Sequence, residues 1–139
     1  MKIVWNSWSK KTTTPDDIKA LEGEVVSSVT GLAVGSEEIV FTTESGKAIK
    51  LYHKQDCCES VAVEDLEGSD SNIVGGKVWL AEEVEGKVKI TDWGDQMYTF
   101  YKIETDKGGV WIRWSGESNG YYSISVYVLG GAVLSEDEQ

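Results

Sequence analysis

The chain has 139 residues, of which 40% are hydrophobic, and this fits a packed globular protein and excludes a disordered one. Twenty-four acidic residues against 13 basic ones give a formal net charge of −11, so we expect no direct binding to nucleic acid. No apolar run reaches the roughly 20 residues of a membrane helix, and the N-terminal stretch lacks the apolar core of a signal peptide. We therefore expect a cytoplasmic protein that binds no membrane.

The N-terminal extension, residues 1–20, is predicted to contain the start of one short helix. Thr14 suits the N-cap, Pro15 suits the first helical position, and the two aspartates that follow favour the positive end of the helix dipole. Gly23 then ends the helix, so that it spans about two turns.

From Gly23 onward, apolar and polar residues alternate in short runs, which is typical of β-strands. The stretches "ESGK" and "DKGG" predict turns between neighbouring strands, and "EGSDSNIVGG" predicts either a loop or one helical turn. The predicted strands are residues 24–34, 37–44, 47–53, 59–66, 77–84, 96–105, 109–115 and 121–129, with a turn-rich flap at 85–95.

The order of these elements shows no alternation of strand and helix. We therefore predict one α+β, β-dominated domain over residues 1–139, with about seven strands and one or two short helices. The strands should form an antiparallel, strongly curved sheet or a partly open barrel. Residues 135–139 are an acidic tail, which we expect to fray.

Residues 116–120 read Gly-Glu-Ser-Asn-Gly and match the G-x-S-x-G motif of serine hydrolases. That motif needs a strand before the serine and a helix after it, whereas predicted strands flank Ser118 on both sides. The two glycines are better explained by a hairpin turn with positive φ angles. We therefore do not assign hydrolase chemistry to Ser118.

A first polar cluster contains the only histidine and both cysteines of the chain. Its residues are His53, Asp56, Cys57, Cys58 and Glu59. Adjacent cysteines in an extended segment point to opposite sides, and no other histidine or cysteine completes a zinc site, so we predict no metal. A nucleophilic Cys–His pair would need a tight fold-back of the segment. The alternative is a structural corner in which one cysteine is buried and Asp56 caps backbone amides.

A second polar cluster surrounds the only arginine of the chain. Its residues are Arg113, Trp114, Glu117, Asn119, Tyr121 and Tyr122. An arginine among aromatic, amide and carboxylate groups could bind a phosphate, a carboxylate or a stacked base. The alternative is a structural ion pair of Arg113 with Glu117 or Asp56.

The stretches "KLYHKQDCCESVAVEDLEG" at 50–68 and "YTFYKIETDKGGVWIRWSGESNGYYSISV" at 98–126 together resemble a small, uncharacterised domain family. The resemblance spans roughly residues 21–128. The family occurs mostly in bacteriophage and prophage genomes and has no assigned activity. The resemblance implies a phage-type origin and makes the two clusters the hallmark of the family, but it implies no mechanism.

Both clusters could lie at the same end of a curved sheet and form one polar pocket. The residues predicted to bind a ligand there are His53, Asp56, Glu59, Arg113, Trp114, Glu117, Asn119, Tyr121 and Tyr122.

Three functions are compatible with the sequence. The leading hypothesis is a non-enzymatic phage accessory protein that binds a basic host protein through its acidic surface, as an inhibitor of a host defence system would. The first alternative is a module that binds a small molecule or a nucleotide through Arg113 and His53. The second is an enzyme that uses Cys57 or Cys58 together with His53. We predict no cofactor in any of them.

Overall fold

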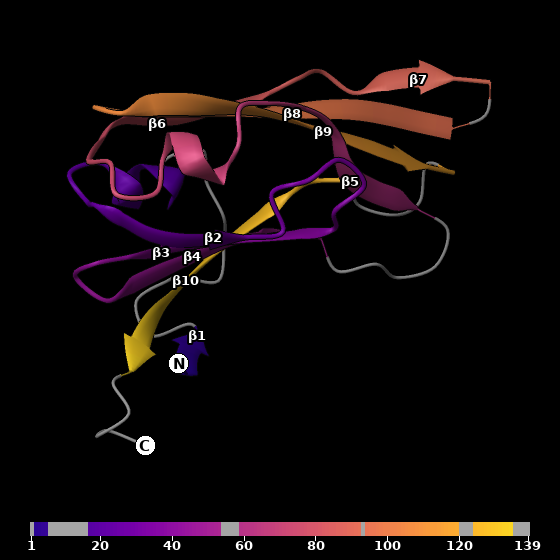
Figure 1. Ribbon diagram of the computed structural model, residues 1–139. Helices are drawn as coiled ribbons and strands as arrows, with labels where there is room; N and C mark the ends of the chain where they lie inside the picture. Colours follow the sequence, from indigo (N-terminus) through magenta and orange to yellow (C-terminus); the bar gives the residue numbers. More distant parts are fainter. Residues whose placement is uncertain (1, 6–16, 54–58, 93, 120–123, 135–139) are drawn as a thin grey trace.

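The computed structural model describes residues 2–5, 17–53, 59–92, 94–119 and 124–134. Within these ranges the chain is built almost entirely of β-strands (Figure 1). The strands are β1 (Lys2–Trp5), β2 (Val26–Thr30), β3 (Glu38–Thr43), β4 (Lys47–Tyr52), β5 (Ser60–Glu67), β6 (Val78–Glu85), β7 (Lys89–Thr91), β8 (Gly94–Thr105), β9 (Gly108–Ser118) and β10 (Tyr127–Leu134).

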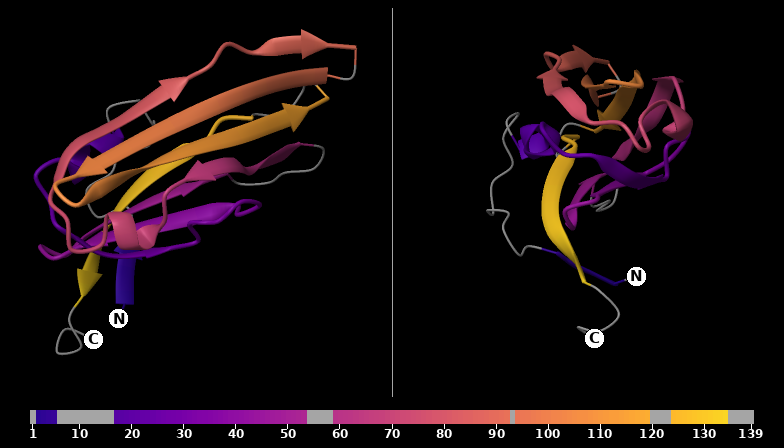
Figure 2. Two further views of the ribbon diagram at one scale, coloured as in Figure 1. Left: turned by 45° about the horizontal axis from the view of Figure 1, so that its top comes forward. Right: turned by 60° about the vertical axis from the view of Figure 1, so that its left-hand side comes forward.

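The strands form two antiparallel sheets, which Figure 1 shows as two layers and Figure 2 shows from two further directions. One sheet has the order β1-β10-β4-β3-β2, and the other has the order β5-β9-β8-β6, with the short β7 beside β8. Our prediction of about seven strands in one curved sheet or partly open barrel was therefore wrong. Alternation along a strand shows that one of its faces is buried, but it does not show which strands share a sheet.

The hydrophobic core fills the space between the two sheets. The first sheet contributes mainly Phe41 and Leu51, and the second contributes mainly Tyr101, Ile112 and Trp114, all with side chains that are almost fully buried. Each of these residues has an exposed or half-exposed neighbour along its strand, as expected when only one face of a sheet packs on a core. The opposite face of the second sheet is consequently open to solvent at Phe100 and Trp111, whereas Thr42 and Ala48 on the opposite face of the first sheet are buried.

The described residues contain no α-helix, so the predicted one or two short helices are corrected to two 3₁₀ turns, η1 (Asp17–Leu21) and η2 (Asp70–Asn72). In η1, Ile18 and Leu21 are fully buried. Three residues make one turn of a 3₁₀-helix, so this spacing places both side chains on the same side. The predicted stop at Gly23 is confirmed, because this residue has a φ of +88° and its N–H donates to the carbonyl of Val78 at 2.7 Å.

Two predicted turns are confirmed and one is not. The "ESGK" turn joins β3 to β4 and the "DKGG" turn joins β8 to β9 in antiparallel pairs. The "GESNG" stretch does not make a hairpin, because β9 and β10 belong to different sheets. Gly116 instead permits a close approach, since a Cβ atom there would lie 2.6 Å from the carbonyl oxygen of Ile124.

The last strand was predicted at residues 121–129 but lies at Tyr127–Leu134. The pair Gly130 and Gly131 reads as a chain break in the sequence, yet both residues are buried within β10. A Cβ atom on Gly131 would lie 2.6 Å from the carbonyl oxygen of Val4, so the glycine allows β1 to pair closely. The acidic tail at 135–139 lies outside the described residues.

Candidate functional site

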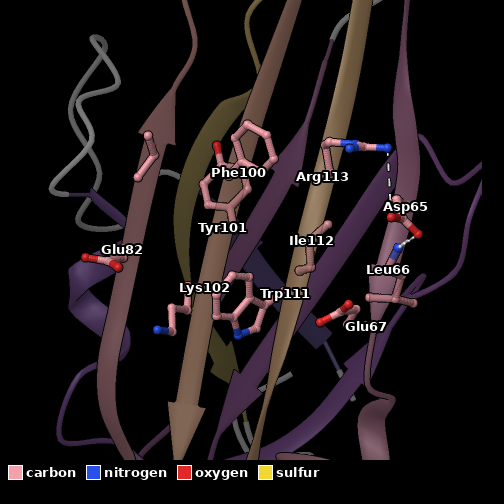
Figure 3. A pocket seen from close by; sticks show the side chains of 11 residues that line it. Asp65, Leu66, Glu67, Glu82, Phe100, Tyr101, Lys102, Trp111, Ile112 and Arg113 are labelled. Atoms are coloured by element: carbon pink, nitrogen blue, oxygen red, sulfur yellow. Dashed lines mark hydrogen bonds and ion pairs between the residues drawn. The ribbon is translucent and has the colours of Figure 1, made fainter.

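The open face of the β5-β9-β8-β6 sheet carries outward side chains in two rows that run across the strands. The register of the sheet aligns them. From β6 to β5, one row is Val84, Phe100, Arg113 and Asp65, and the other is Glu82, Lys102, Trp111 and Glu67. Figure 3 shows these side chains on all four strands, and together they line a groove of about 460 Å³. We call this the outer groove.

Two β-bulges determine which carboxylates reach the outer groove. In β5, Val61 and Val63 point into the core, and simple alternation would also turn Asp65 and Glu67 inward. The register shifts between Val63 and Asp65, so Glu64 is an extra residue and the alternation reverses after it. Asp65 and Glu67 therefore point outward.

The same device occurs at the opposite edge of this sheet. In β6, Val78 and Ala81 are both buried although three positions separate them, because the register shifts around Trp79. The shift turns Glu82 and Val84 outward, where a regular strand would have turned them toward the core together with Val78. Both acidic ends of the outer groove thus depend on one inserted residue each.

Arg113 is held in the groove by two carboxylates from the β5 bulge. Its Nε lies 3.3 Å from Glu64 Oε2, and its Nη2 lies 3.8 Å from Asp65 Oδ2. The guanidinium carbon also lies 5.4 Å from the ring centroid of Tyr98. The structure therefore shows an ion pair of the predicted kind at Arg113, but its partners among the described residues are Glu64 and Asp65 and not the predicted Glu117. The other predicted partner, Asp56, lies outside the described residues.

Lys102 is also paired within the sheet. Its Nζ lies 4.6 Å from the ring centroid of Trp111 and 3.9 Å from Glu104 Oε1. The indole N–H of Trp111 donates to the same Glu104 oxygen at 3.2 Å. These contacts fix the orientation of Trp111, whose residue surface is still 51% exposed.

The groove therefore combines exposed apolar surface with an excess of negative charge. Phe100 is 41% exposed and Val84 is 56% exposed. The two cations are paired with Glu64, Asp65 and Glu104, whereas Glu67 and Glu82 have no ion pair with any residue that the structure describes. Such a surface can accept a positively charged, partly apolar group.

The first predicted cluster is different in character. His53 follows β4 and Glu59 precedes β5, and their side chains are 1% and 0% exposed, with Nε2 and Oε2 3.6 Å apart. His53 Nδ1 donates to the carbonyl of Ser125 at 2.7 Å, and its ring stacks on that of Tyr127 at a centroid distance of 5.6 Å. This buried pair connects the segments that lead from one sheet to the other.

Part of the second cluster lies close to the buried pair. Ser60, next to Glu59, pairs with Glu117 in the register of β5 and β9, and the exposed Asn119 follows directly after β9. Glu117 accepts a hydrogen bond from Gln96 Nε2 at 3.3 Å and lines a second, polar hollow of about 200 Å³. The two hallmark stretches therefore meet at Ser60 and Glu117, close to the buried pair.

The structure does not join all the predicted ligand-binding residues into one pocket. Arg113 lies on the solvent face of β9, and Trp114 lies in the core with 1% exposure. His53 and Glu59 are buried rather than open to a ligand. The remaining predicted residues, Asp56, Tyr121 and Tyr122, lie outside the described residues, as do Cys57 and Cys58.

Sequence reasoning missed most of the outer groove. The alternation along β8 was a usable signal for two groove residues, because Phe100 and Lys102 alternate with buried Tyr101 and Ile103. Glu67 and Glu82 could not be assigned in this way, because the two bulges reverse the alternation. Their position required the register of the sheet.

Among the described helical turns, none is long and apolar enough to cross a membrane. Comparison with the curated proteins and with the solved structures gave no match for this chain. A family match covers residues 18–128, which include β2 to β9, the outer groove and the start of β10. The chain thus belongs to the family described as "Domain of unknown function (DUF7448)".

Proposed function

We propose that this protein is a non-enzymatic binding protein whose outer groove docks on a basic surface of a partner protein. The observation that carries the proposal is the open sheet face, where exposed Trp111 and Phe100 lie beside carboxylates without cationic partners among the described residues. Aromatic side chains provide contact area at low entropic cost, and complementary charge speeds encounter and selects the partner. The formal net charge of −11 acts in the same direction.

The partner we propose is a host protein, and the biological role is inhibition of a host defence system. The phage-type resemblance of the two hallmark stretches supports this part of the proposal. Occupation of a basic channel by an acidic protein would block nucleic acid from the same channel by charge competition.

The test is a quantitative affinity purification from host lysate with three forms of the protein. These are the wild type, a groove variant with Glu67→Lys and Glu82→Lys, and a control variant with Glu37→Lys and Glu44→Lys, two exposed carboxylates outside the groove. Both variants change the net charge by the same amount. We expect the groove variant alone to lose the partner.

The recovered partner is then purified, and its dissociation constant is measured at 50 and 300 mM salt. Because paired charges release counterions and are screened, we expect binding to weaken at least tenfold over this range. Equal recovery by the two variants, or an affinity that does not depend on salt, would contradict the proposal.

A small-molecule or nucleotide site is the second candidate. The volume of the outer groove, about 460 Å³, is within the range of ligand pockets, and Arg113 and Trp111 could contact a phosphate and a base. Native mass spectrometry of protein purified from its host would reveal a retained small molecule. Arg113→Ala should then remove that mass while the folded protein remains.

A further inference from the structure

Two carboxylates of the outer groove, Glu67 and Glu82, have no ion pair with a described residue, and they lie at opposite ends of one row. Glu82 is on β6 and Glu67 is on β5, and Lys102 and Trp111 lie between them (Figure 3). The order β5-β9-β8-β6 separates the two edge strands by three strand spacings. Neighbouring strands lie about 4.8 Å apart, so the backbones that carry Glu67 and Glu82 are separated by about 14 Å.

This separation matches a simple periodicity of an extended peptide. Each residue of an extended chain advances about 3.3 Å, so residues i and i+4 are about 13 Å apart. Residues i, i+2 and i+4 also point to the same side of such a chain. A peptide that crosses the strands would therefore place residue i at one carboxylate, residue i+4 at the other and residue i+2 above the middle of the row, between Trp111 and Lys102.

The chemistry of the row defines what these three residues should be. Glu67 and Glu82 favour arginine or lysine at i and i+4, because both carboxylates keep their charge free of a described partner. Trp111 is half exposed, and its orientation is fixed by the hydrogen bond to Glu104 and by Lys102, whose Nζ lies 4.6 Å from the ring centroid. The exposed part of the indole and the methylene stem of Lys102 together present an apolar surface to residue i+2. Phe100 in the adjacent row extends this surface.

We infer that the outer groove recognises an extended partner segment with cationic residues at i and i+4 and an apolar residue at i+2. This inference rests on the proposed function and adds to it the sequence pattern of the partner. The strands that carry the row are fixed by the sheet, so the spacing of the two carboxylates is built into the register and not into a loop.

The test uses two capped peptides of identical composition as probes. The matched peptide is Ser-Arg-Ser-Leu-Ser-Arg-Ser, and the mismatched peptide is Ser-Arg-Arg-Leu-Ser-Ser-Ser, which has adjacent arginines. Binding to the full chain is titrated by calorimetry at low salt. An exposed ion pair changes affinity by up to about fivefold, so we expect the matched peptide to bind roughly fivefold more tightly.

The same titrations on the variant with Glu67→Gln and Glu82→Gln separate this inference from the proposed function. Glu37→Gln with Glu44→Gln is the control, and circular dichroism checks that each variant is folded. We expect only the groove variant to lose the preference for the matched peptide.

If both peptides bind the wild type equally and both are lost from the groove variant, the spacing is wrong and the proposed function stands. If neither peptide distinguishes the groove variant from the control variant, the outer groove is not a site for basic segments and both proposals fail.

Discussion

The buried pair and the outer groove are built from similar side chains in opposite environments. His53 and Glu59 face each other with 1% and 0% exposure at a junction between the sheets. Arg113 and Asp65 face each other on the open sheet, at 39% and 61% exposure. A buried ionisable pair constrains the fold because separation of its members leaves a charge without solvent, whereas an exposed pair costs little to break. Ionisable side chains in this chain are therefore buried within the fold at one place and exposed on the surface at another.

The largest expected effect sharpens this comparison with two tryptophans from the same strand. Trp114→Ala removes a core side chain and should lower the free energy of unfolding by about 3–5 kcal/mol. Trp111→Ala removes a half-exposed ring and should lower it by about 1 kcal/mol or less. Urea unfolding of both variants measures the difference. Similar losses would show that the open face is structural.

Replacement of one member of the buried pair should have the next largest effect. We expect Glu59→Ala to destabilise the protein by about 3 kcal/mol, because it leaves His53 buried without its acidic neighbour. In the double variant with His53→Ala, the decrease in the free energy of unfolding should be smaller than the sum of the decreases in the two single variants, by about 1 kcal/mol or more. Strict additivity in a double-mutant cycle would mean that the two side chains do not interact.

Arg113→Ala should cost much less, about 0.5–1 kcal/mol, because its partners Glu64 and Asp65 are themselves partly exposed. Thermal unfolding measures the loss, and Arg113→Lys, which keeps the charge but not the planar fork, is the matched variant. A decrease in the free energy of unfolding above about 3 kcal/mol would show that Arg113 stabilises the fold as strongly as a member of the buried pair.

The smallest effect concerns Glu24, an acid of intermediate exposure near the edge of the first sheet. The hydroxyl of Ser45, which donates to Glu24, is the main cause that holds its pKa below the ordinary value of 4.5, and Lys47, with its Nζ 3.6 Å from the carboxylate, adds to this. A lowered pKa in the folded state stabilises the protein above the unfolded value, and this stabilisation is lost as the pH falls through the folded value.

Glu24→Gln should therefore flatten the fall in stability below about pH 4.5 and leave the slope near pH 7 unchanged. Chemical unfolding at a series of pH values from 3 to 7 measures this. An unchanged acid limb in the variant would show that Glu24 carries no stability of this kind.

Local elements could be predicted from the sequence more fully than their assembly. The β3–β4 and β8–β9 pairs follow from short turns with glycine between alternating strands. The division into two sheets could not be predicted, because β10 pairs with β4 across a long stretch of chain and leaves no local signal. Most of β10 could not be predicted either, because Gly131 reads as a turn residue in the sequence. The glycine is needed instead for the close approach of β1 to β10.

The candidate site shows the same limit. The scarcity of histidine and cysteine in the chain favoured a site at His53, yet the described members of that cluster, His53 and Glu59, are buried. The outward orientation of Lys102 and Trp111 could be predicted from the sequence, because both residues lie in regular strands. Glu67 and Glu82 were not, because a bulge is a property of two paired strands and neither strand reveals it alone.

The two bulges also restrict how the gene can change. Deletion of the codon for Glu64 or for Trp79 would remove the bulge and leave a regular strand, in which Glu67 or Glu82 still points outward. A one-residue insertion or deletion elsewhere in β5 or β6, with the bulge retained, would instead exchange inside and outside for the rest of that strand. Among homologues that keep the groove, a one-residue difference in the length of β5 or β6 should therefore occur at the bulge.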